Sequence, residues 1–137
     1  MLYSLNKISF GTSKKDVVFD VDLPYDVYDF CYLQDFGFLF VLRDNHCISR
    51  IDLKGNLTVE WIGSVDQRGF KEGSGKYACL DFPSSICYHK QSGNCFVIER
   101  GGSSIRSVEV EDRYVYTLLG TSVMKKLSTP LFPIFVI

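Results

Sequence analysis

Apolar and polar residues alternate along most of this chain with the period of two that is typical of β-strands. Four such stretches lie between residues 24 and 62, and four more lie between residues 83 and 120, separated by short turns rich in Gly, Asn and Asp. The predicted strands are 25–32, 38–42, 47–53, 57–62, 85–88, 95–99, 104–110 and 114–119. No segment shows the period of 3.6 that marks an amphipathic helix. The pattern therefore predicts an all-β fold of antiparallel strands joined by tight turns.

The two groups of strands repeat each other in sequence. Two segments of the first group recur 57 residues later, 38–43 (FLFVLR) as 95–100 (CFVIER) and 48–51 (ISRI) as 105–108 (IRSV). Upstream of them the offset is 56 residues, so that Cys31 matches Cys87. Residues 2–10 and 16–21 look like the last two strands of an earlier unit. A repeating four-stranded antiparallel unit is a propeller blade, and we expect about two and a half of them.

Three stretches resemble the NHL repeat, a family of β-propeller blades. They are the Asn-His-containing stretch 44–55 (DNHCISRIDLKG), the Gly- and Phe-containing connector 63–75 (GSVDQRGFKEGSG) and the Phe-Pro entry into the next blade at 80–87 (LDFPSSIC). The second unit departs from the pattern, because Gly101-Gly102 stands there in place of the Asn-His pair. The resemblance extends over about residues 24–120. It implies NHL-type blades in an incomplete ring, since the family's closed rings have five or six blades and this chain is too short for one.

The repeat and the resemblance together divide the chain into five parts. Residues 1–23 are expected to be the end of a preceding blade, 24–62 the first full blade, 63–82 a Gly-rich inter-blade loop, 83–122 the second full blade and 123–137 an apolar C-terminal tail. Loops as long as the one over residues 63–82 are uncommon inside a compact domain unless they serve a purpose. This loop is therefore a candidate contact surface.

Composition narrows the functions that are open. The 137 residues carry a formal net charge of −1, with both signs mixed along the chain, so no strong basic field favours nucleic acid. The N-terminal residues lack the pattern of a signal peptide, and no apolar stretch is long enough to span a membrane. We expect a cytoplasmic protein without membrane association. Five cysteines without a C-x-x-C pair indicate buried, reduced thiols rather than disulfides or zinc ligands.

The sequence offers no catalytic constellation. His46 and His89 are the only histidines, and neither has a second His or Cys at metal-ligand spacing. The serine pairs at 84–85 and 103–104 lack the pattern of a nucleophile elbow. We therefore predict no catalytic residues, no metal site, no cofactor and no enzymatic activity.

Functions from different classes remain open. An incomplete ring leaves apolar sheet faces uncovered, which favours a protein-interaction scaffold that binds a protein partner or associates with itself. The alternative is an RNA-binding NHL module, in which the basic and aromatic loop and nearby arginines contact RNA. Its contact residues would be Arg68, Phe70, Lys71, Lys76, Arg100 and Arg106, together with Arg113. A truncated product of a larger NHL-repeat protein is a further alternative.

Overall fold

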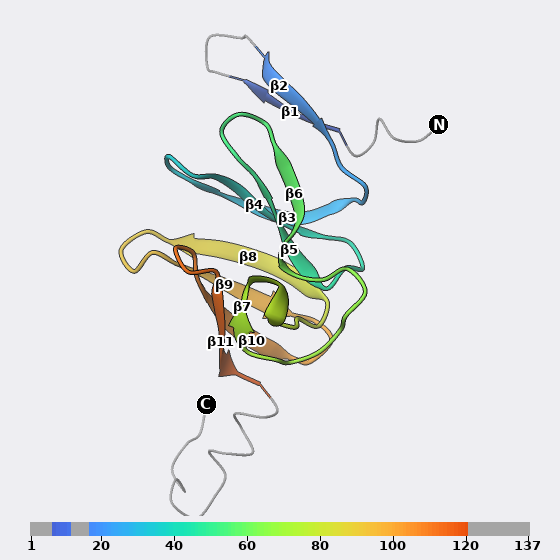
Figure 1. Ribbon diagram of the computed structural model, residues 1–137, viewed down its shortest axis with the longest axis vertical. Helices are drawn as coiled ribbons and strands as arrows, with labels where there is room; N and C mark the ends of the chain where they lie inside the picture. The colour runs from blue at the N-terminus through green and yellow to red at the C-terminus, as the bar shows by residue number, and fades with distance from the viewer. Residues whose placement is uncertain (1–6, 12–16, 121–137) are drawn as a thin grey trace, which may run out of the picture.

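The computed structural model describes residues 7–11 and 17–120 of the 137-residue chain. Every regular element in that part is a β-strand, except for one short 3-10 helix, Gly75–Tyr77. The strands form three antiparallel sheets, which follow one another in chain order along the long axis of the molecule (Figure 1). The predicted all-β, antiparallel, propeller-like fold is therefore confirmed.

The first sheet is a hairpin of β1 (Lys7–Gly11) and β2 (Val17–Asp22). The sequence predicts strands over 2–10 and 16–21 here, and residues 2–6 and 16 lie outside the described residues. Val21 at the end of β2 and Leu23 just after it are buried with the next sheet's Phe40, Leu42 and Ile51. The hairpin's end therefore covers part of one face of that sheet.

The second sheet, which we call the first blade, is a four-stranded meander. Its strands are β3 (Val27–Leu33), β4 (Gly37–Leu42), β5 (Cys47–Ile51) and β6 (Leu57–Gly63), in that order across the sheet. Gly37 closes the turn between β3 and β4 with a φ of 121°. The Ile51 carbonyl oxygen lies where a Cβ at residue 37 would be, so this position requires glycine.

The third sheet, the second blade, contains the expected four strands and one more. They are β8 (Pro83–His89), β9 (Asn94–Glu99), β10 (Ser104–Glu109) and β11 (Tyr114–Leu119). The extra strand, β7 (Gly73–Ser74), pairs with β11 and comes from the inter-blade loop. Ser74 Oγ donates to the Asp112 carbonyl at 2.9 Å, and the Glu72 carboxylate accepts from Thr117 N–H at 2.6 Å. The loop is therefore part of the second blade rather than a solvated connector.

The two blades pack face to face around one apolar core. The first blade contributes Leu33, Leu39, Val41, Ile48, Trp61 and Ile62, and the second contributes Ile86, Cys95, Val97, Val108 and Val115. One carboxylate joins the blades at the edge of this core, because Asp29 Oδ2 accepts from Ser85 Oγ and from Ile86 N–H, each at 2.9 Å. None of the described segments forms a helix long and apolar enough to cross a membrane.

Candidate functional site

The entry to the second blade forms a junction around Phe82, which has a positive φ of 50°. The Phe82 ring lies edge-on to the ring of His46, with the centroids 4.3 Å apart. The Phe82 backbone N–H donates to His46 Nδ1 at 3.2 Å. Burial lowers the pKa of His46, which favours the neutral ring whose Nδ1 accepts this bond. His46 therefore joins the two blades and has a structural role.

Two arginines predicted as contact residues meet at this junction. The guanidinium carbons of Arg68 and Arg100 lie 5.3 and 5.0 Å from the centre of the Phe82 ring. Each cation lies beside a carboxylate, since Arg68 Nε lies 2.6 Å from Asp81 Oδ1 and an Arg100 nitrogen lies 3.1 Å from Asp44 Oδ1. Asp44 is shared with Arg43, whose Nε lies 3.5 Å from Asp44 Oδ2. The junction, defined as His46, Arg68, Phe82 and Arg100, is therefore largely neutralised.

The remaining predicted contact residues of the loop lie elsewhere. The exposed Phe70 ring covers Gly102, whose missing side chain leaves the room that this ring fills. The side chains of Lys71 and Lys76 are exposed, and within residues 17–120 no ion pair or ring contact joins them to the junction. Lys76 lies near Glu60, whose pKa is lowered mainly by a hydrogen bond from Val65 N–H. The lysines therefore do not extend the arginine cluster.

Arg106 is not a surface residue, contrary to its assignment from the sequence. Its side chain has no exposed area and lies 2.9 Å from Glu99 Oε1, which is also completely buried. The same guanidinium donates to the carbonyls of Cys79 and Lys71 at 3.1 and 3.2 Å. Glu99 also accepts from Ser104 Oγ and from a backbone N–H of the loop. The ion pair therefore holds the inter-blade loop onto the second blade.

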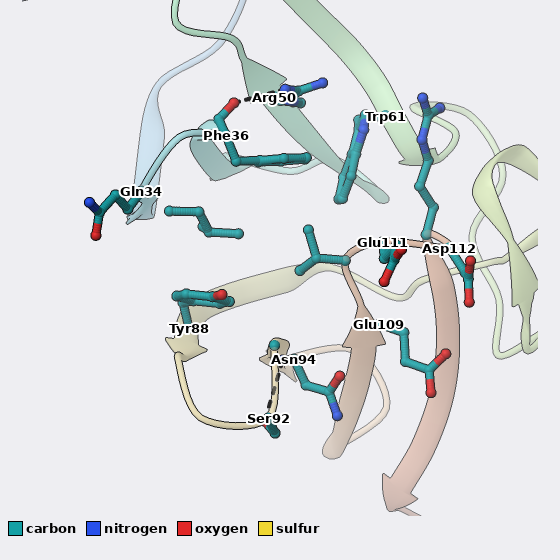
Figure 2. A pocket seen from close by; sticks show the side chains of 14 residues that line it. Gln34, Phe36, Arg50, Trp61, Tyr88, Ser92, Asn94, Glu109, Glu111 and Asp112 are labelled. Carbon is teal, nitrogen blue, oxygen red and sulfur yellow. Dashed lines mark hydrogen bonds between the residues drawn. The ribbon is translucent and has the colours of Figure 1, made fainter.

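A cleft of about 740 Å³ lies between the blades beside the turns that follow β3 and β10 (Figure 2). Its wall on the first blade is aromatic, with the rings of Phe36 and Trp61 edge to face at 5.6 Å. The Arg50 guanidinium stacks 3.7 Å over Phe36 and donates to its carbonyl at 2.8 Å. Arg113, predicted as an RNA contact, lies 5.6 Å from the Trp61 ring. The sequence analysis missed this cleft, although Trp61 is the chain's only tryptophan.

The second blade contributes a polar wall to the same cleft. This wall contains the carboxylates of Glu109, Glu111 and Asp112, with Asn94 and Ser92 beside them (Figure 2). In the part of the chain that the structure describes, no group of three His, Cys, Asp or Glu residues has the geometry to hold a metal ion. The cleft combines aromatic surface with charges of both signs.

The second blade has an exposed apolar face on the side away from the first blade. We call it the open face, formed by Cys87, Phe96, Ile98, Ile105, Tyr116 and Leu118. Ile98 pairs with Ile105 across β9 and β10, as Val41 pairs with Ile48 across β4 and β5. Val41 and Ile48 are completely buried, whereas Ile98 is 50% exposed. No described strand lies beyond this face in Figure 1.

The first blade exposes an aromatic cluster on the side away from the second blade. Phe30 and Tyr32 of β3 are exposed, and both rings contact Phe38, at 6.2 and 5.0 Å between centroids. Val21 and Leu23 cover another part of that face, around Phe40, Leu42 and Ile51. The two ends of the blade pair therefore differ, because one is partly covered by the described chain.

None of the five cysteines is in a disulfide in the described structure, and they are not all buried. Cys47 and Cys95 are buried, Cys31 and Cys79 are half-buried, and Cys87 is exposed. The prediction of a buried thiol is wrong for Cys87, because its side chain lies on the open face of the second blade. Burial raises the pKa of Cys47 to about 11, which keeps this thiol protonated near neutral pH.

Comparison with known proteins gives a likeness of fold. No family model matches the chain, and no curated protein sequence matches it. The chain is similar to the crystal structure of an auxiliary nutrient binding protein from Bacteroides thetaiotaomicron VPI-5482, with a TM-score of 0.60 and 16% sequence identity. The likeness covers 86% of this chain and 32% of that one. The chain therefore spans about a third of the length of this neighbour, and at such low identity the likeness shows the fold alone.

Proposed function

We propose that this protein is a non-enzymatic interaction scaffold of the NHL-repeat type, acting in the cytoplasm, and that its open face is the contact surface. The observation that supports this proposal is the difference between matched positions. Residues that form the core in the first blade, such as Trp61 at 2% exposure, correspond to residues such as Leu118 at 49% exposure. The same strand pattern thus has a covering sheet in the first blade and no described covering sheet in the second blade.

The size of the open face makes this difference energetically important. Four strands spaced about 4.8 Å apart and six residues rising about 3.3 Å each give a face of roughly 400 Å². At about 25 cal/mol per Å², covering it contributes on the order of 10 kcal/mol before ordering costs are subtracted. A face of this size is comparable to the largest apolar patch on a typical monomer, and such patches are often functional.

Sedimentation velocity of the whole chain over a micromolar concentration range tests the proposal. We expect the wild type to sediment as a species larger than 15.6 kDa. The Ile98→Glu variant should sediment as a monomer, because a charge at the centre of the face opposes its burial.

Leu53→Glu is the matched control. Leu53 is 48% exposed, close to the 50% of Ile98, but it lies in the turn between β5 and β6 of the first blade. This variant should associate like the wild type. A wild type that is monomeric and indistinguishable from Ile98→Glu in both sedimentation and unfolding would contradict the proposal.

RNA binding is the second candidate, and the meeting of Arg68 and Arg100 at Phe82 is the observation that favours it. Their ion pairs with Asp81 and Asp44 weigh against it, because RNA phosphates would have to displace both carboxylates. Titration of the protein with single-stranded RNA at several salt concentrations decides between the two functions. Affinity that falls steeply with salt and is lost in an Arg68→Ala, Arg100→Ala variant would favour the RNA-binding function.

A further inference from the structure

The open face has a composition that allows it to meet a copy of itself. Its central residues, Phe96, Ile98, Ile105 and Tyr116, carry no charge, and Leu118 borders them on β11. On this side of the sheet the β10 strand carries the carboxylate of Glu109, in the last pair of the register at the end of the face. Two identical faces therefore oppose each other without like charges at their centres.

The first blade shows which kind of surface packs against a face of this type. Its matched residues Leu39, Val41 and Ile48 are covered by an antiparallel sheet that presents branched apolar side chains, among them Ile86, Val97, Val108 and Val115. The open face of a second copy is also an antiparallel sheet that presents branched apolar side chains, from Ile98, Ile105 and Leu118. Contact between two open faces is therefore sheet-on-sheet packing of the same general kind, but it joins two like faces, whereas the two blades join unlike faces.

In the part of the chain that the structure describes, the other apolar end of a second copy is the far face of the first blade, and this end is partly covered. On the first blade's far face, Phe40, Leu42 and Ile51 are already buried with Val21 and Leu23. A head-to-tail contact would displace this segment before an open face could cover the same residues. The open-face contact requires no such displacement.

We propose that the partner of the open face is a second copy of this chain, joined open face to open face about a two-fold axis. This inference rests on the proposed function. Such an isologous contact closes at two copies and leaves the first blade's aromatic cluster outside the interface. Two faces of roughly 400 Å² bury about 800 Å² in total, which is less than the roughly 1,200–2,000 Å² of stable specific interfaces, so we expect a weak dimer that dissociates in the micromolar range.

Two single variants and their mixture test this arrangement by sedimentation. Ile98→Glu, on the open face, should raise the dimer dissociation constant at least 30-fold, roughly the effect of losing a central interface anchor. Phe30→Glu, on the opposite aromatic cluster, should leave it unchanged within about twofold. An equimolar mixture of the two variants should contain no more dimer than expected from the Phe30→Glu protein alone.

Each other result overturns the inference in a recognisable way. Loss of the dimer in both variants with recovery in the mixture means head-to-tail association, which leaves the proposed function standing. A monomeric wild type whose Cys87 is nevertheless protected from a maleimide means that the chain covers its own face. A dimer that Ile98→Glu does not weaken removes both this inference and the proposed use of the open face.

Discussion

Equivalent apolar positions in the two blades are buried to different extents. In the first blade, Val41, Ile48 and Ile62 are completely buried because the second blade packs on them. In the second blade, Ile98, Ile105 and Leu119 occupy the corresponding pairs, and all three retain exposed area. The apolar character of a strand therefore reflects the repeat, whereas its burial depends on whether a neighbouring sheet is present.

The blades also differ inside. Where the first blade has Leu42 and Ser49, the second has the buried ion pair of Glu99 and Arg106 at the same offset of 57 residues. Leu42 packs in an apolar cluster, and Ser49 Oγ donates to the Val59 carbonyl at 2.6 Å. The charged pair instead binds backbone groups of the inter-blade loop. The second blade thus uses charge to fix a long connection that has no described equivalent before the first blade.

Of the substitutions that test this comparison, breaking the buried ion pair should lower the free energy of unfolding the most. Arg106→Ala leaves the Glu99 carboxylate buried without its cation, so the free energy of unfolding should fall by about 3–5 kcal/mol. The matched variant Ser49→Ala removes one hydrogen bond and should cost about 1 kcal/mol. Urea titrations followed by circular dichroism at one fixed protein concentration measure both values. Equal losses in the two variants would show that the ion pair has no special role.

Truncating matched apolar residues tests the difference in burial. Val41→Ala creates a cavity between the blades and should lower the free energy of unfolding by about 2 kcal/mol. Ile98→Ala removes atoms that are already half exposed and should cost less than about 1 kcal/mol in the monomer. The titrations are done at protein concentrations below the dimer dissociation constant. A larger loss for Ile98→Ala than for Val41→Ala would mean that the open face is covered within the monomer.

A smaller effect is expected at the carboxylate that joins the blades. Asp29→Ala removes the acceptor for Ser85 Oγ and Ile86 N–H, which should cost about 1–2 kcal/mol. Asp66→Ala is the control, because Asp66 is exposed in the inter-blade loop. Thermal unfolding of both variants measures the difference. If the two variants melt together, the hydrogen bonds of Asp29 do not help to hold the blades in place.

The strands and the repeat are predictable from the sequence because both depend on local pattern. The inward position of Arg106 is also encoded locally, since it lies two residues from Ser104 and two from Val108, both buried on β10. The surface position predicted for Arg106 is based on its charge and not on this alternation. In the β9–β10 register Arg106 lies opposite Val97 and Glu99 lies opposite Ser104, so the ion pair is a diagonal contact on one face of the hairpin.

Other features depend on contacts that no local pattern contains. The pairing of Gly73–Ser74 with β11 joins residues about forty positions apart, and it depends on where the second blade places the edge of β11. The cleft beside Trp61 exists only once the two blades are packed together. The meeting of Arg68 and Arg100 at Phe82 likewise requires the loop to fold back onto the second blade.

The matched cysteines Cys31 and Cys87 provide the most direct test of the central claim that a partner copy covers the open face. Maleimide labelling at pH 8, followed by mass spectrometry of the peptides, is measured from below to well above the dimer dissociation constant. We predict that Cys87 reacts rapidly in dilute protein and at least tenfold more slowly in concentrated protein. The labelling rate of Cys31, already half-buried between the blades, should not change with concentration. A Cys87 rate that is equally fast at all concentrations would contradict the account.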